Sequence, residues 1–172
     1  MSAQRIKNRE FFTRSAEELA KDLIGKVLCH KDKDGFVIKG RIKTTEVYLS
    51  NDPATDANRS SKPTSQLMSG GHIHLFYISP DSTRNRLDIV ANEENVAESV
   101  LIAEIDLYDG PQKALWAMDM NSLDFDGRDL LTDEWVYVED DGVEVVLDEP
   151  TQRKGINTPE PLRFSAKKFV FN

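Results

Sequence analysis

The grouping of its apolar residues is what most constrains the fold of this chain. They fall in short runs rich in β-branched and aromatic residues, and turn signals such as Asp-Gly separate the runs. The segment 26–30 and the long run 36–49 flank the turn 31–35, which predicts a hairpin. Residues 72–78 and 99–107 predict two further strands. The pattern therefore favours a mostly antiparallel sheet.

One helix is predicted before these strands and another after them. Ser15-Ala16-Glu17-Glu18 is a capping box, and apolar residues at helical spacing follow it, which predicts a helix from Ser15 to Ile24. Gly110-Pro111 predicts the start of a second helix that continues to Met120, because proline is tolerated in the first turn.

The end of the chain adds strand signals and completes the fold prediction. Asp140-Asp141-Gly142 between two apolar runs predicts a second hairpin, and residues 164–171 are expected to close a sheet. Strands dominate and do not alternate regularly with helices, so the predicted class is α+β. We expect residues 1–172 to form a single domain, since this length lies below that at which cores divide.

Composition excludes several classes of protein. Hydrophobic residues make up 39% of the chain, which argues against general disorder. No segment approaches the roughly 18 to 20 apolar residues of a membrane span, and no apolar signal region follows the N-terminus. The lone Cys29 allows no intramolecular disulfide and no CxxC zinc pair. We therefore expect a cytoplasmic protein without membrane contact, near the nucleoid if the source is prokaryotic.

The charge of the chain is unevenly distributed. The net charge is −8, and residues 119–149 hold twelve acidic residues against one arginine, Arg128. A sequence pI near 4.9 argues against nonspecific nucleic-acid binding through bulk charge, because such binding depends on Lys and Arg. A local basic face remains compatible with this composition.

Glu46 does not fit the strand that contains it. Side chains alternate across a strand, so Glu46 shares a face with the apolar Ile42 and with Tyr48. An unpaired carboxylate is costly in such surroundings. One interpretation is that a bulge or the sheet end turns Glu46 to solvent, or that a lysine pairs with it. The other is that Glu46 is a partly desolvated general base.

The chain resembles the alkyladenine (methylpurine) DNA glycosylase family in a set of short motifs that occur in the family's order. The resemblance covers nearly the whole chain and is weakest between residues 61 and 108. The matching pieces in the first half are Phe11-Phe12, Leu19-Ala20, residues 23–28, Gly40-Arg41-Ile42, residues 45–48, Asp52-Pro53-Ala54 and Arg59; those in the second half are residues 110–115, 126–130 and 161–164.

This resemblance implies a fold and a chemistry. Family members flip a damaged purine out of the duplex and hydrolyse its N-glycosidic bond, because a stacked base is out of reach. By position, Glu46 matches the glutamate that activates water, and Tyr48 matches a tyrosine that stacks on the flipped base. Tyr77 matches the tyrosine that fills the gap left in the duplex. Tyr48 and Tyr77 are also compatible with a role as ordinary core aromatics.

Several positions depart from the family pattern. Thr44 replaces a glutamate, Asp56 a histidine, and His74 a second pocket tyrosine. Ala103 replaces an arginine in the strand before the second predicted helix. The family's active-site asparagine has two candidate counterparts, Asn85 and Asp88, and neither is assigned.

Asp56 and His74 lead to a hypothesis about specificity. A carboxylate beside the flipped base would favour cationic purines such as 3-methyladenine and 7-methylguanine over neutral ones such as hypoxanthine. Alternatively, Asp56 pairs with His74 and the pocket no longer accepts a base.

The resemblance also implies a duplex partner and its contacts. The stretch 119–149 should face away from the DNA. The basic residues near the matched segments are the expected phosphate contacts, with solvated surface charge as the alternative: Arg41, Lys43, Arg59, Lys62, Arg84 and Arg86.

The expected activity is that of a monofunctional DNA-3-methyladenine-type glycosylase in base excision repair. No cofactor or metal is expected, since water is the nucleophile and the pair His72 and His74 lacks a clear third ligand. Double-stranded DNA with damaged purines is the expected partner of a monomer. One alternative is a protein that kept the fold and binds damaged DNA without turnover. A second is an acidic domain that binds protein and has no nucleic-acid role.

Overall fold

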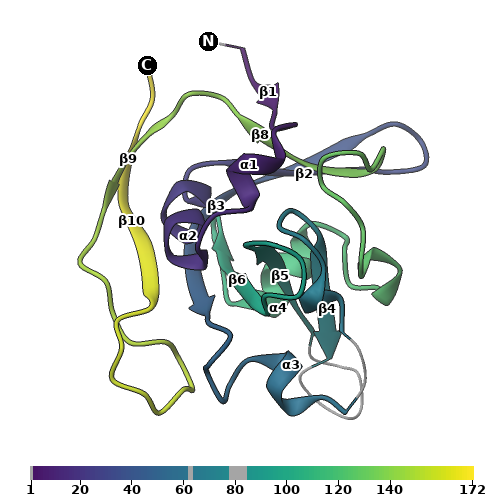
Figure 1. The fold of residues 1–172 in the computed structure, drawn as a ribbon. Helices are drawn as coiled ribbons and strands as arrows, with labels where there is room; N and C mark the ends of the chain where they lie inside the picture. The colour runs from purple at the N-terminus through teal and green to yellow at the C-terminus, as the bar shows by residue number, and fades with distance from the viewer. Residues whose placement is uncertain (1, 62–63, 78–84) are drawn as a thin grey trace.

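The structure, a computed structural model, describes residues 2–61, 64–77 and 85–172. The strands of the described residues form one curled sheet (Figure 1). The strands are β1 (Gln4–Arg5), β2 (Val27–Lys31), β3 (Val37–Tyr48), β4 (Ile73–Tyr77), β5 (Asn85–Ala91), β6 (Glu98–Ile105), β7 (Tyr108–Asp109), β8 (Val136–Asp140), β9 (Glu144–Leu147) and β10 (Arg163–Val170).

The helices of the described residues are short. They are α1 (Arg9–Phe12), α2 (Ala16–Leu23), α3 (Asp56–Arg59) and α4 (Pro111–Ala117), with 3₁₀ turns η1 (Ser65–Leu67) and η2 (Leu123–Phe125). The α+β class predicted from the sequence is confirmed. None of the described helices is long and apolar enough to cross a membrane.

The pairing of the strands is antiparallel throughout the central order β1-β8-β2-β3-β6-β5-β4. The long strand β3 lies at the centre, because it pairs with β2 over its first half and with β6 over its second half. β10 pairs with the second half of β3 from the other side, so the C-terminal segment closes the sheet as predicted (Figure 1).

The first helix forms where the capping box predicted it. Ser15 precedes α2, and its hydroxyl accepts a hydrogen bond from the Glu18 backbone N–H. Gly25 follows the helix with a φ of +91°, a conformation that favours glycine. The predicted second helix is also present as α4, but it ends at Ala117, three residues earlier than expected.

Two strand predictions from the sequence need correction. The segment between residues 78 and 99 contains a strand, β5, whose apolar residues were not recognised between turn-rich sequences. The hairpin predicted around Asp140-Asp141-Gly142 was wrong, since β8 pairs with β1 and β2, whereas β9 pairs with β10. The two strands pair with different neighbours, and Asp141, which lies between them, is bound by Arg41.

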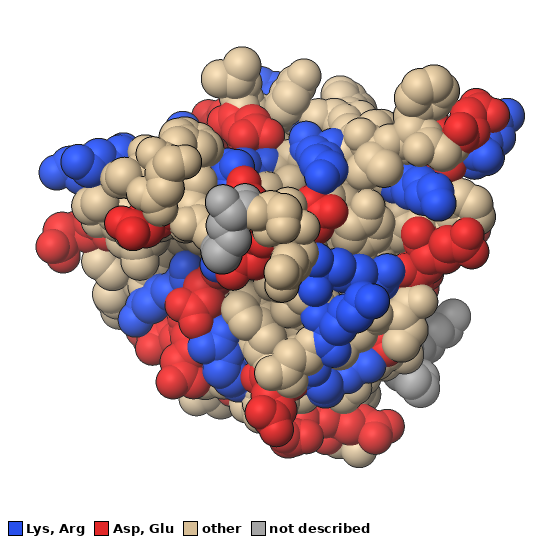
Figure 2. All heavy atoms as spheres, turned by 90° about the horizontal axis from the view of Figure 1, so that it is seen from above, with Lys and Arg blue, Asp and Glu red and all other residues tan. Residues whose placement is uncertain are grey.

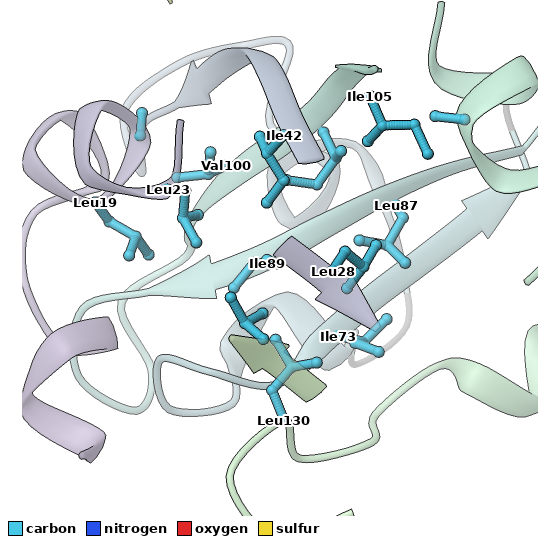
Figure 3. Packing of buried hydrophobic residues seen from close by; sticks show 14 of the residues in the cluster. Leu19, Leu23, Leu28, Ile42, Ile73, Leu87, Ile89, Val100, Ile105 and Leu130 are labelled. Atoms are coloured by element: carbon cyan, nitrogen blue, oxygen red, sulfur yellow. The ribbon is translucent and has the colours of Figure 1, made fainter. Parts of the chain in front are cut away.

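The main core lies between α2 and one face of the sheet. Leu19 and Leu23 of α2 pack with sheet residues such as Ile42, Ile89 and Val100 (Figure 3). Each fully buried aliphatic side chain of this kind contributes about 1.5–3 kcal/mol to folding. A second, smaller cluster contains Tyr48, Leu101 and Ala103. The second half of β3 is therefore buried on both faces.

Two glycines mark close approaches in this fold and lead to a prediction about stability. A Cβ on Gly70 would collide with the backbone carbonyl of Phe12, which has little freedom to move. A Cβ on Gly40 would approach the flexible side-chain ends of Ile105 at 2.7 Å and Met118 at 2.9 Å. We expect Gly70→Ala to lower the free energy of unfolding by about 1–3 kcal/mol and Gly40→Ala by less. Urea denaturation of both variants measures this, and equal losses would contradict it.

Candidate active site

A change of register in β3 decides which way Glu46 points. The pairing between β3 and β6 shifts between Ile42 and Thr45, and the alternation of faces shifts with it. Ile42 and Val47 both belong to the main core, whereas Tyr48 belongs to the smaller cluster. The expectation that Glu46 shares a face with Ile42 was therefore wrong, although Glu46 does share one with Tyr48.

Glu46 is buried and paired rather than turned to solvent. Only 2% of its surface is exposed. The Arg163 guanidinium donates from Nη1 to Glu46 Oε2 at 2.8 Å, and from Nη2 to Glu104 Oε1 at 2.9 Å. The backbone N–H of Lys154 donates to the same Glu46 oxygen at 3.2 Å. Arg163 thus compensates a carboxylate whose burial would otherwise be costly.

A cavity of about 400 Å³ opens beside Glu46. This volume lies within the range of small-molecule sites. Glu46, Tyr48 and Arg163 line it together with Arg59, Arg86 and Lys154. Residues 109–111 and 154–156 also contribute to the lining. A buried carboxylate, an aromatic residue and several basic groups therefore converge on one hollow.

Tyr48 is the aromatic residue of this cavity, but little of its ring is accessible. The residue is 2% exposed, and burial raises the pKa of its hydroxyl. The guanidinium of Arg86 lies 4.1 Å from the ring centroid, and that of Arg153 lies 4.8 Å from it. Arg153 in turn pairs with Asp52 and donates to the Val47 carbonyl at 3.0 Å.

Asp56 and His74 lie elsewhere and bind each other. His74 Nε2 lies 3.3 Å from an Asp56 carboxylate oxygen, and this interaction lowers the pKa of Asp56. His74 Nδ1 shares a hydrogen bond of 2.6 Å with the Ser65 hydroxyl, which itself donates to Asp126. Neither Asp56 nor His74 is among the described residues that line the cavity beside Glu46. This geometry agrees with the alternative in which Asp56 pairs with His74.

Comparison with known proteins identifies the family of this chain. The sequence model of the family "Methylpurine-DNA glycosylase (MPG)" matches residues 10–107, which is more than half of the chain and contains Glu46, Tyr48 and Arg86. The protein belongs to the methylpurine-DNA glycosylase family. The match ends before the segment that supplies Arg163.

Individual relatives carry the name "Putative 3-methyladenine DNA glycosylase". The protein from Prosthecochloris aestuarii is 37% identical over 105 residues, which cover 59% of this chain and 50% of that protein. The one from Clostridium novyi is 33% identical over 123 residues, which cover 67% of this chain and 59% of that protein. One from Chlorobium phaeobacteroides is 29% identical over 150 residues, which cover 76% of this chain and 74% of that protein. The chain spans about half the length of the first of these relatives.

The basic residues predicted to contact phosphates have different surroundings in this methylpurine-DNA glycosylase family member. Arg59 is exposed and lines the cavity. Arg86 also lines it but is largely buried, and it pairs with Asp88. Arg41 pairs with Asp141, and Lys43 lies 3.9 Å from Glu104. Lys62 and Arg84 lie outside the described residues, as does the side chain of Tyr77.

The acidic stretch 119–149 contributes nothing to the described lining of this cavity. Its carboxylates pair with basic residues of other elements, as Asp129 does with Arg9 and Glu139 does with Lys39. On the face in Figure 2, Lys and Arg alternate with Asp and Glu without an extended basic surface. The described residues of this stretch therefore add no negative charge to the cavity lining.

Thr44 and Ala103 also depart from the family pattern, and the structure shows the surroundings of both. Thr44 bonds the Ser165 hydroxyl at 2.9 Å, which joins β3 to β10. Ala103 lines the cavity, and its small side chain helps leave the space open. Of the two asparagine counterparts, Asn85 binds Asn121, whereas Asp88 binds Arg86. Among the described residues, no group of three or more His, Cys, Asp or Glu side chains is placed to hold a metal ion.

Sequence reasoning missed three basic residues near the site: Arg153, Lys154 and Arg163. Arg163 lies in the matched piece 161–164, so a motif signal existed, but that piece says nothing about its partner. Arg153 and Lys154 carried no signal, since they lie in a polar loop that only the tertiary structure brings to β3.

The pair of Arg41 and Asp141 leads to a prediction about pH. Hydrogen bonds from Arg41, at 3.0 and 2.6 Å, lower the pKa of Asp141 from 3.8 to about 2. A lowered pKa stabilises the fold above pH 3.8, and this stabilisation is lost as the pH falls toward about 2. We expect Asp141→Asn to cost about 0.5–1 kcal/mol at pH 7 and almost nothing at pH 2.

Urea denaturation at several pH values measures this difference. Asp148→Asn is the matched control, because Asp148 is exposed and has no ion pair among the described residues. A loss for Asp141→Asn that did not change with pH would contradict the prediction.

Proposed function

We propose that this protein is a DNA glycosylase that hydrolyses the N-glycosidic bond of alkylated or otherwise damaged purines. One observation carries the proposal: Glu46 is 2% exposed, is held by Arg163, and borders a cavity of about 400 Å³. Membership in the methylpurine-DNA glycosylase family and the names of the relatives support the same chemistry.

The residues at the cavity suit the hydrolysis of a flipped nucleotide. Water attacks the sugar carbon C1′ while the bond from C1′ to the purine nitrogen breaks, and the departing base takes the bonding electrons. Glu46 accepts the proton of the attacking water and later releases it to solvent. The hydrogen bonds from Arg163 and Lys154 both fall on Oε2, which leaves Oε1 to hold the water.

Double-stranded DNA that carries a damaged purine is the proposed partner. The base must leave the stack to reach Glu46, and the cavity walls then enclose it. The exposed Arg59 and Lys154 line the cavity and are suited to bind the phosphates that flank the flipped nucleotide. Because the acidic stretch 119–149 is absent from the described lining, it would not repel the backbone at this point.

Glu46→Gln tests the proposal, because the amide keeps the shape of the side chain and cannot accept the water proton. We expect release of free purine from alkylated duplex DNA to fall at least 100-fold, within the usual range for a general base. Binding of the damaged duplex should persist. Base release is measured by chromatography and binding by gel shift at low salt.

Glu10→Gln is the control, since Glu10 is an exposed residue of α1 and is absent from the cavity lining. Equal base release by the wild type and Glu46→Gln would contradict the assigned role. A wild type that binds damaged DNA but releases no base would support the binder that lacks turnover. Absence of any shift on intact and abasic duplexes would support a protein-binding domain instead.

A further inference from the structure

We propose that Arg86 forms the surface on which the flipped base stacks, and that it selects neutral damaged purines over cationic ones. This inference rests on the proposed glycosylase function and names its substrate class. It assigns to Tyr48 the role of a support for Arg86. It also reverses the preference for cationic purines that Asp56 suggested in the sequence.

Both Arg86 and Tyr48 line the cavity beside Glu46. Tyr48 is 2% exposed, and the Arg86 guanidinium carbon lies 4.1 Å from its ring centroid. Arg86 lines the cavity, and 12% of its side chain is exposed. Of these two residues, Arg86 is therefore the more exposed. Planar guanidinium groups are established stacking partners for unpaired bases.

The position of Arg86 is fixed from behind by Asp88. Arg86 Nε and Nη2 donate to the two carboxylate oxygens of Asp88 at 3.2 and 3.1 Å. Asp88 is fully buried, and it accepts a further hydrogen bond of 2.7 Å from Ser99. Gln66 donates to that same hydroxyl at 2.8 Å. This chain of bonds holds the guanidinium in one plane before any base arrives, which lowers the entropic cost of stacking.

The distribution of charge around Arg86 determines which bases fit. The compensating carboxylate of Asp88 lies on the buried side, whereas the guanidinium borders the cavity. The carboxylate of Glu46 is already paired with Arg163, and that of Asp56 with His74. A cationic purine on Arg86 would bring two positive charges into contact in a poorly solvated site, which is unfavourable. A neutral purine presents an electron-rich face and avoids this repulsion.

Binding measurements in the Glu46→Gln background test the inference without requiring turnover. The probes are three duplexes that differ in one base: guanine, hypoxanthine, which is neutral, and 7-methylguanine, which is cationic. The readout is the ratio of the dissociation constant for 7-methylguanine to that for hypoxanthine. We expect the ratio to fall about tenfold when Arg86→Met and Asp88→Asn are combined, because stacking and repulsion are both lost.

Two further variants separate charge from stacking and guard against misfolding. Asp88→Asn alone leaves the guanidinium with less compensation, so the ratio should rise. Arg86→Lys keeps the charge beside Asp88 but loses the planar surface, so binding of hypoxanthine DNA should weaken about tenfold while binding of undamaged DNA persists. Circular dichroism and thermal melting confirm that each variant is folded.

The outcomes distinguish this inference from the proposed function. A ratio that is the same in all folded variants would overturn the role of Arg86, even if the wild type excises bases. A ratio that shifts as expected, in a protein that releases no base, would support Arg86 and count against hydrolysis. Tighter binding of 7-methylguanine DNA than of hypoxanthine DNA, with Arg86 and Asp88 intact, would also overturn the inference.

Discussion

The buried ion pair between Glu46 and Arg163 is the interaction on which the proposed site depends. It joins β3 to β10, two strands that are neighbours in the sheet but more than one hundred residues apart in the chain. Without Arg163 the carboxylate would be buried beside an apolar cluster with too few partners to offset its desolvation. The same guanidinium also binds Glu104 of β6, so three adjacent strands are tied together at the cavity.

The register change in β3 is the second constraint, because it lets one strand serve two environments. Before the change, Ile42 points into the main core against α2. After it, Val47 points to that core while Glu46 and Tyr48 point to the cavity. A strand with strict alternation would place Glu46 on the face of Ile42, in the main apolar core. The irregularity therefore makes a buried carboxylate compatible with a continuous core.

Several residues that depart from the family pattern take part in networks of ion pairs and hydrogen bonds. The Asp56 carboxylate lies 3.3 Å from His74, next to Ser65 and Asp126. Asp88 takes Arg86 as its partner, and Arg86 covers Tyr48 beside the small residue Ala103. Among the described residues, the buried carboxylates of Glu46, Asp52 and Asp88 each lie within hydrogen-bonding distance of an arginine, as burial requires. The cavity that remains has a different chemical surface from the one that the matched motifs imply.

Much of the fold was readable from the sequence by itself, for local reasons. The capping box and Gly25 define α2 through bonds within a few residues, and the runs of apolar residues define most strands. The family and Glu46 as its candidate base also followed from ordered motifs. The pairing of β9 with β10 and the strand β5 did not, because the partner of a strand depends on distant segments and not on its own turn residues.

Only the tertiary structure decided what surrounds the candidate base. Strict alternation of side chains along the strand predicted that Glu46 shares a face with Ile42. A change of register in β3, which has no local sequence signal, reversed this. Arg163, Lys154 and Arg86 meet Glu46 and Tyr48 because β10, a loop and β5 converge on β3. The energy of a buried charge depends on the groups that surround it in space, and a sequence fixes those groups only through the complete fold.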